Sequence, residues 1–237
     1  EIYTIADIPS RGTGLGSSSA VTVGLLNALH VYAGREVSSE QLAREACEIE
    51  IDILSQPIGR QDQYAAAYGG INSILFGNGG VSVDRIDASN ETIRRISEEF
   101  TLVFTGMSRS ASEVLKESPE DESDKTSRLR TIRGHADMAH DMMVNGDVLG
   151  LGSLIGDAWD AKRGISASVS GAALDDLHER IMAMGATGAK LLGAGGGGFF
   201  LVHGSVGLRE QLASLGEPHR LIPLDVDWTG SEIIHNG

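Results

Sequence analysis

The sequence predicts an α+β fold, and three observations support this class. Apolar stretches of helical length alternate irregularly with short apolar runs, without the regular strand–helix alternation of a doubly wound sheet. A glycine-rich tetrapeptide, Gly77-Asn78-Gly79-Gly80, separates two short apolar runs, which is typical of a β-hairpin. The chain has 237 residues and is 41% hydrophobic and 22% charged, as expected for a globular protein of one large domain or two small ones.

Helices and strands of the first half follow from hydrophobic periodicity and from breaker residues. Ser38 and Gln41 form a capping box that starts the second helix, and Pro57 ends it. The helices expected here cover about 17–33, 38–57 and 62–69. The strands expected here cover 2–8, 71–76, 81–86 and 102–105.

In the second half, a polar, acidic and proline-containing run at 118–127 predicts an exposed loop. The helices expected after it cover about 126–145, 147–161, 171–184 and 206–215. The strands expected there cover 199–203 and 220–223. The composition changes character near residue 105, which predicts two subdomains, 1–105 and 106–237.

Bulk properties exclude several classes of function. The formal net charge is −14 and lysines and arginines do not cluster, which argues against a nucleic-acid partner. No apolar run approaches the roughly 18 residues of a membrane span, so no membrane partner is expected. The single cysteine, Cys47, excludes an internal disulfide and weakly favours a reducing, cytoplasmic location. It lies in an apolar helical stretch, which favours a packed thiol over a nucleophile.

The run Pro9–Ala20 carries glycines at 12, 14 and 16 and three serines, followed by an apolar helix. Such a turn brings backbone amides and a helix dipole to an anion, although a tight turn alone would also need glycine. No lysine precedes Ser17, as a Walker loop requires, and Ser17 stands where a dinucleotide fingerprint needs glycine. The sequence therefore indicates a phosphate loop of neither common kind.

Two carboxylates and a second glycine-rich loop carry further chemistry. Glu50 lies at the flank of an apolar helical stripe, where it either extends to solvent or binds a partner or metal. Asp62 follows a Pro/Gly break, as a helix N-cap or as a carboxylate aimed at a substrate hydroxyl. The loop 193–198 is flanked by apolar sequence, which favours close approach to a ligand over a hinge.

Together these motifs resemble the GHMP kinase superfamily. The resemblance rests on Gly14-Leu15-Gly16-Ser17-Ser18, on Glu50 and Asp62 in the Pro57–Gln63 setting, and on Gly193–Gly198. Within the superfamily, the runs 59–70, 105–111 and 190–194 are most similar to D-glycero-D-manno-heptose 7-phosphate kinases. The resemblance implies two subdomains, one like ribosomal protein S5 domain 2 and truncated at its N-terminus, the other ferredoxin-like.

The resemblance also implies a reaction: transfer of the ATP γ-phosphoryl group to a sugar hydroxyl, expected to be O1 of a heptose 7-phosphate, with Mg²⁺. Asp62 would be the catalytic residue, and Ser18 and Glu50 the metal ligands. The residues expected at the ATP phosphates are Arg11, Gly12, Gly14, Leu15, Gly16, Ser17, Ser18 and Ser19. The residues expected on the substrate side are Gln61, Gln63, Arg109, Lys190, Gly195, Gly196, Gly197 and Gly198. Arg11, Arg109 and Lys190 could equally be solvated surface charges.

The superfamily's first motif, Arg-x-Pro-x-Arg with Gly-Gly-x-Thr-Asp, is absent, so this chain alone is expected to show little kinase activity. The partners expected are a sugar phosphate and, for assembly, a second copy in a homodimer. Alternatives are a non-catalytic sugar- or nucleotide-binding protein, a kinase for another sugar such as fucose or galactose, and a decarboxylase of the superfamily. A nicotinamide oxidoreductase is suggested only by the glycines.

Overall fold

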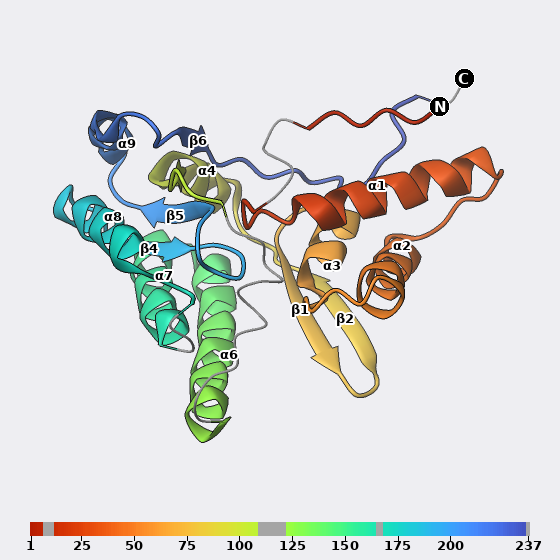
Figure 1. The fold of residues 1–237 in the computed structure, drawn as a ribbon, viewed down its shortest axis with the longest axis horizontal. Helices are drawn as coiled ribbons and strands as arrows, with labels where there is room; N and C mark the ends of the chain where they lie inside the picture. The colour runs from red at the N-terminus through yellow and green to blue at the C-terminus, as the bar shows by residue number, and fades with distance from the viewer. Residues whose placement is uncertain (7–11, 109–121, 165–167, 236–237) are drawn as a thin grey trace. The chain divides into compact units, whose positions relative to one another are not determined.

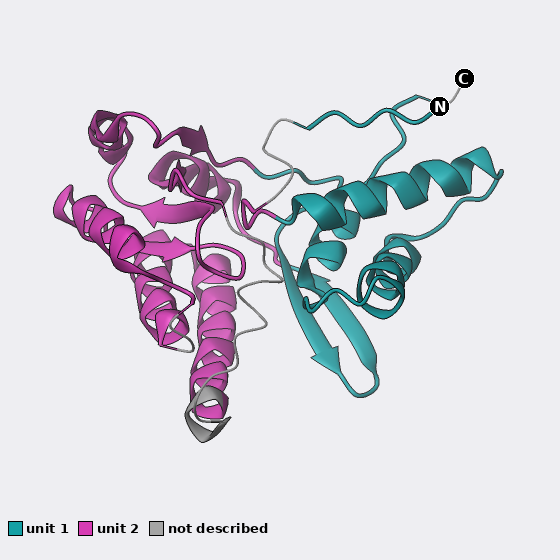
Figure 2. Ribbon diagram, viewed as in Figure 1, with its two compact units in different colours: residues 1–11, 16–85, 226–237 teal, residues 12–15, 86–225 magenta. Residues whose placement is uncertain are grey.

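A computed structural model describes residues 1–6, 12–108, 122–164 and 168–235, the side chains of 122–125 excepted. Its contacts divide the chain into two compact units (Figure 2). Unit 1 comprises 1–11, 16–85 and 226–237, and unit 2 comprises 12–15 and 86–225. The changeover at 85–86 lies before the boundary expected near residue 105, and the C-terminal segment returns to unit 1.

Unit 1 consists of helices and one hairpin (Figure 1). Its elements are α1 (Ser17–Tyr32), α2 (Ser39–Cys47), the π-helix η1 (Glu48–Ile53), α3 (Gln61–Tyr68), β1 (Asn72–Gly77) and β2 (Gly80–Arg85). The strands pair antiparallel from Asn72↔Arg85 to Gly77↔Gly80, which confirms the predicted hairpin. The three helices bury one apolar cluster: Val23, Leu42, Ala43, Ala46, Cys47, Tyr64 and Ala67. The predicted N-cap is also present, because the Ser38 hydroxyl accepts from the Gln41 backbone N–H at 3.2 Å.

Unit 2 holds a four-stranded antiparallel sheet in the order β4-β5-β3-β6. Its elements are α4 (Asn90–Glu99), β3 (Phe100–Phe104), α6 (Glu122–Asn145), α7 (Val148–Arg163), α8 (Ala172–Ala183), β4 (Gly188–Leu191), β5 (Phe199–His203), α9 (Leu208–Leu212), the 3-10 turn η2 (Ala213–Leu215) and β6 (Leu221–Pro223). In chain order, the first and third strands of the unit (β3 and β5) are central, and the second and fourth (β4 and β6) lie at the edges. This is the split β-α-β order of a ferredoxin-like fold, as expected.

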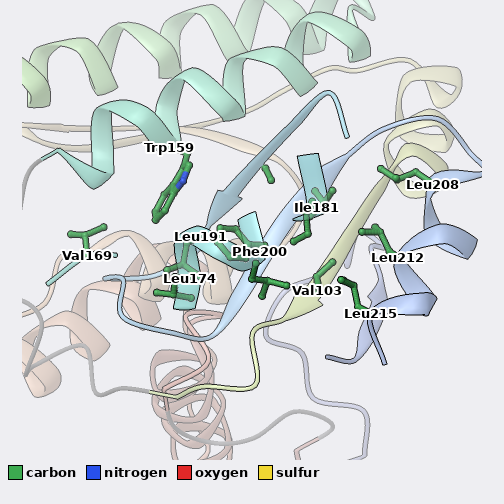
Figure 3. Close-up of a cluster of buried hydrophobic side chains, with 13 residues drawn as sticks. Val103, Trp159, Val169, Leu174, Ile181, Leu191, Phe200, Leu208, Leu212 and Leu215 are labelled. Carbon is green, nitrogen blue, oxygen red and sulfur yellow. The ribbon is translucent and has the colours of Figure 1, made fainter. Parts of the chain in front are cut away.

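The core of unit 2 lies on one face of this sheet (Figure 3). Trp159 of α7 meets Phe200 of β5 edge to face, with ring centroids 5.7 Å apart. Small residues let α7 approach the sheet: a Cβ at Gly188 would lie 2.1 Å from the carbonyl oxygen of Gly152. Because α7 packs so closely on β4, the end of this helix lies beside the loop that follows β4.

Three local expectations differ from the structure. Residues 2–6 form no strand; Ile2, Tyr3 and Ile5 are exposed, and within the described chain no strand pairs with them. Glu122–Ser127 belongs to α6, whereas the composition suggested a loop; residues 118–121 lie outside the description. Helix α4 was not anticipated, although Ser89 caps it at the Thr92 N–H (3.1 Å) and Ile96 supplies its buried face.

Candidate functional site

A buried carboxylate lies at the centre of the candidate site in unit 1. Glu50 is only 2% exposed, and three side chains from two helices donate hydrogen bonds to it. Ser18 Oγ donates to Oε1 at 2.8 Å and Ser19 Oγ to Oε2 at 2.7 Å. Gln63 Nε2 also donates to Oε2, at 2.6 Å. A carboxylate buried in this way is stabilised by charge-assisted bonds, so Glu50 does not extend to solvent.

Glu50 owes its position to an irregular helix. α2 continues into the π-helix η1, a wide turn that is rare and frequent at functional sites. Ser55 just beyond it has φ 52°, an uncommon conformation for a residue other than glycine. No sequence pattern indicated the π-helix, which turns Glu50 toward α1 and α3.

Asp62 lies in the first turn of α3, against the start of α1. A Cβ added at Gly16 would lie 3.3 Å from both Cβ and Cγ of Asp62. Burial raises the pKa of Asp62; a hydrogen bond from Gln61 opposes this shift and the charge of Glu50 adds to it. A carboxylate whose pKa is raised at a partly buried position is suited to accept a proton.

The first glycine-rich loop leads directly into α1. Gly16 is the N-cap of α1, in left-handed conformation (φ 69°) and with no capping side chain. Gly16 therefore supplies no side-chain cap to the first helical turn, and the start of a helix is a favourable place for an anion. Ser18 is exposed at this turn and Ser19 is buried. The Ser19 hydroxyl donates to Glu50, whereas a contact with the ATP phosphates was expected of Ser19.

Within unit 2, the preceding residues of the same loop pack against the second glycine-rich loop. A Cβ at Gly14 would lie 2.8 Å from the carbonyl oxygen of Leu192, and one at Gly198 would lie 2.3 Å from the Thr13 oxygen. Gly195 and Gly197 meet the backbone of Val169 and Met107 in the same way. These glycines are thus required where the chain packs against itself.

The residues 195–198 were expected to approach a ligand through their backbone, and the structure shows that two of their amides bond within the protein. The Gly196 amide donates to the Val169 carbonyl at 3.0 Å, and the Gly198 amide to the Met107 carbonyl at 2.8 Å. An amide already bonded within the protein is not available to a phosphate oxygen. Sequence composition could not distinguish a loop that approaches a ligand from a loop that packs against its own chain, because both need residues without a side chain.

Lys162, at the end of α7, is a candidate that no sequence motif indicated. Its Nζ donates to the carbonyl oxygen of Leu191 at 3.0 Å and to that of Gly193. Burial and the charge of Lys190 lower the pKa of Lys162 to about 7, and burial also lowers the pKa of Lys190. Lys162 lies in no motif, and its role depends on the packing of α7 on β4.

The remaining expected residues divide into three groups. Gln61 is exposed beside Asp62, whereas Gln63 is fully buried on Glu50, which differs from the expected substrate contact. Arg11 and Arg109 lie outside the described residues. Cys47 is 8% exposed, and burial raises the pKa of its thiol to about 11, as suits a packed residue rather than a nucleophile.

Two kinds of feature are absent from the described residues. The described residues contain no group of three or more histidine, cysteine, aspartate or glutamate side chains that could hold a metal ion. Among the helices that the structure describes, none combines the length and the apolar character needed to cross a bilayer.

Comparisons with known proteins agree with the motifs. Residues 1–70 match the family described as the GHMP kinases N terminal domain. The D-glycero-alpha-D-manno-heptose 7-phosphate kinase of Campylobacter jejuni is 31% identical over 201 residues, 84% of this chain and 59% of that protein. The bifunctional fucokinase/GDP-fucose pyrophosphorylase of Arabidopsis thaliana is 28% identical over 208 residues, 85% of this chain and 19% of that protein.

A crystal structure of a Campylobacter jejuni protein superposes with a TM-score of 0.74 at 27% identity, over 94% of this chain and 65% of that one. The α+β fold of the GHMP kinase type is thereby confirmed. This chain spans less than two thirds of the length of the heptose 7-phosphate kinase and of that crystal structure.

Proposed function

Because the chain belongs to the GHMP kinase superfamily, we propose that it transfers the γ-phosphoryl group of ATP to a sugar hydroxyl. The observation that carries the proposal is the arrangement of Ser18, Glu50 and Asp62 around the start of α1 in unit 1. A plain structural turn does not need a buried carboxylate with three donors and a second one of raised pKa beside it.

The loop from Gly12 to Ser19 is proposed to hold the ATP phosphates. Its glycines let the backbone approach closely, and the start of α1, where Gly16 has no side chain, offers amides and a positive dipole end. The exposed Ser18 hydroxyl adds one polar contact, whereas the buried Ser19 supports Glu50 from behind.

The donor set at Glu50 fits Mg²⁺, which prefers oxygen ligands and keeps several water and phosphate ligands of its own. Oε2 accepts two hydrogen bonds and Oε1 only one, so Oε1 and the exposed Ser18 oxygen are the atoms that would hold the ion. When bound, Mg²⁺ would neutralise phosphate charge.

Asp62 is proposed to orient the sugar hydroxyl and to accept its proton. Phosphoryl transfer depends mostly on positioning and on charge neutralisation, so this proton moves late in the reaction. The raised pKa makes the Asp62 carboxylate a stronger base than an exposed aspartate. Gly16 supports the same function, because its lack of a side chain leaves room for the Asp62 side chain at the end of the phosphate loop.

The proposed acceptor is O1 of D-glycero-D-manno-heptose 7-phosphate. The support is the heptose 7-phosphate kinase relative, which at 31% identity aligns with 84% of this chain. A fucose kinase is the second candidate, favoured by the similarity to the Arabidopsis fucokinase.

The test is transfer of labelled γ-phosphate from ATP to a panel of free and phosphorylated sugars, in the 237-residue chain and in the longest natural form of the protein. Transfer to the heptose 7-phosphate alone supports the proposed acceptor, and transfer to fucose favours the second candidate. Binding of a fluorescent ATP analogue with no transfer to any sugar would identify a non-catalytic binding protein. Binding of NADH in place of the ATP analogue would overturn the proposal.

A further inference from the structure

We infer that Lys162 and Lys190 form a phosphate-binding pair in unit 2, which takes a phosphate group of ATP or of a phosphorylated sugar. The inference deepens the proposed function and rests on it, since it assigns a ligand group to residues beside the phosphate loop. Neither the motifs nor the comparisons assign a role to Lys162.

Lys162 is held in place while one donor stays available. An ammonium group has three N–H donors, and the carbonyl oxygens of Leu191 and Gly193 take two of them. No third acceptor for Lys162 is found among the residues that the structure describes. The two carbonyls fix the position of the charge without neutralising it.

Lys190 is the strand residue next to one of the two carbonyls that Lys162 binds. In β4, Ala189 and Leu191 point into the core and are fully buried, so Lys190 points to the other face together with Gly188. Lys162 donates to the carbonyl oxygen of Leu191, the residue that follows Lys190, so the two lysines meet at the same end of β4. Within the described part of the chain, no carboxylate pairs with either lysine.

Two neighbouring ammonium groups without a carboxylate are costly in a partly buried place, and an anion would offset that cost. Their position is unusual in an acidic chain: only four lysines occur in the sequence, and the side chains of the other two, Lys116 and Lys125, lie outside the description. The pair therefore does not belong to a general basic surface.

The neighbouring backbone indicates which anion. Gly193, whose carbonyl binds Lys162, packs against Gly14 of the first glycine-rich loop, both within unit 2. A compact, multiply charged oxyanion beside a phosphate loop is a phosphate group, and ammonium groups bind it as point charges. The γ-phosphate of ATP and the phosphate of a sugar monoester share this chemistry.

The test is calorimetric titration of the 237-residue chain with three probes: AMPPNP with Mg²⁺, D-glycero-D-manno-heptose 7-phosphate, and the unphosphorylated heptose. The variants are Lys162→Gln, which keeps a neutral donor for the two carbonyls, and Lys190→Gln, at a lysine whose side chain has no hydrogen bond to another of the described residues. The matched control is Arg163→Gln, next to Lys162 on α7, where the arginine is exposed and paired with Asp160 at 3.1 Å.

We expect each lysine variant to weaken one phosphate probe at least tenfold, with a smaller salt dependence, while the control stays within twofold of wild type. Loss confined to AMPPNP identifies the ATP phosphate, and loss confined to the heptose phosphate, with the free heptose unchanged, identifies the sugar phosphate. Wild-type affinities in Lys190→Gln and in any folded Lys162→Gln variant would overturn the inference and leave the proposed function standing. A wild-type chain that binds neither phosphate would overturn both.

Discussion

Replacing Gly14 by alanine should destabilise unit 2 through the contact between the two glycine-rich loops. Gly14 has φ +72°, where an L-residue costs about 1–2 kcal/mol. The new Cβ would lie 2.8 Å from the Leu192 carbonyl oxygen and 3.1 Å from the Gly193 Cα, and relief of such overpacking costs about 1–3 kcal/mol. The free energy of unfolding should therefore fall by roughly 2–5 kcal/mol, a large part of the total for a typical domain. Urea unfolding measures this change.

The matched control is Gly24→Ala in α1. Gly24 is exposed, and an added Cβ would meet nothing within 4 Å, so alanine should stabilise the helix by about 1 kcal/mol. A fluorescent ATP analogue should bind Gly14→Ala more weakly than Gly24→Ala at temperatures where both variants are folded. If Gly14→Ala unfolds within about 0.5 kcal/mol of wild type, the described packing of the two loops is wrong.

Four further outcomes test the site. Asp62→Asn should lower sugar phosphorylation by about 10²–10⁴-fold with nucleotide affinity within twofold, and near-normal turnover would remove Asp62 from its proposed role. Glu50→Gln should raise the Mg²⁺ concentration needed for half-maximal nucleotide binding, and an unchanged metal titration counts against a ligand role. Gln63→Leu should lower the free energy of unfolding by about 2 kcal/mol in urea, because it removes a donor from the buried Glu50; no loss would contradict that contact. With the pKa of Lys162 lowered to about 7, a bound phosphate should restore its proton, so affinity should fall as the pH rises above 7. Calorimetry in buffers of different ionisation enthalpy should show proton uptake near pH 8, and equal heats would exclude this linkage.

Much of the fold could be predicted because it depends on local pattern. The hairpin 72–85 follows from its glycine turn, and the start of α2 follows from Ser38. Helix α4 was missed because ten mostly polar residues with few apolar ones give a weak period, although Ile96 still packs inward. The strand expected at 2–8 failed over residues 2–6, because apolar alternation does not supply a partner strand.

The residues of the candidate site also differ in whether a local sequence pattern indicated them. Glu50 and Asp62 could be singled out because a carboxylate on an apolar stripe and one after a Pro/Gly break are visible in sequence. Gln63 could not be assigned correctly, because its neighbour Asp62 suggested the substrate, and only packing shows that its amide faces Glu50. Lys162 gave no signal, since its two partners lie about 30 residues further along the chain.

The sequence by itself determined the α+β class and singled out the glycine-rich loop before α1 and the two carboxylates, because turns, caps and periodicity depend on neighbouring residues. Only the tertiary structure decided which donors hold Glu50, why the second glycine-rich loop needs its glycines, and where the lysines lie. Those answers depend on contacts such as Gly14 with Leu192 and Ser18 with Glu50. Residues far apart in the chain meet there because the packing of whole helices and strands brings them together, and no local pattern encodes that meeting.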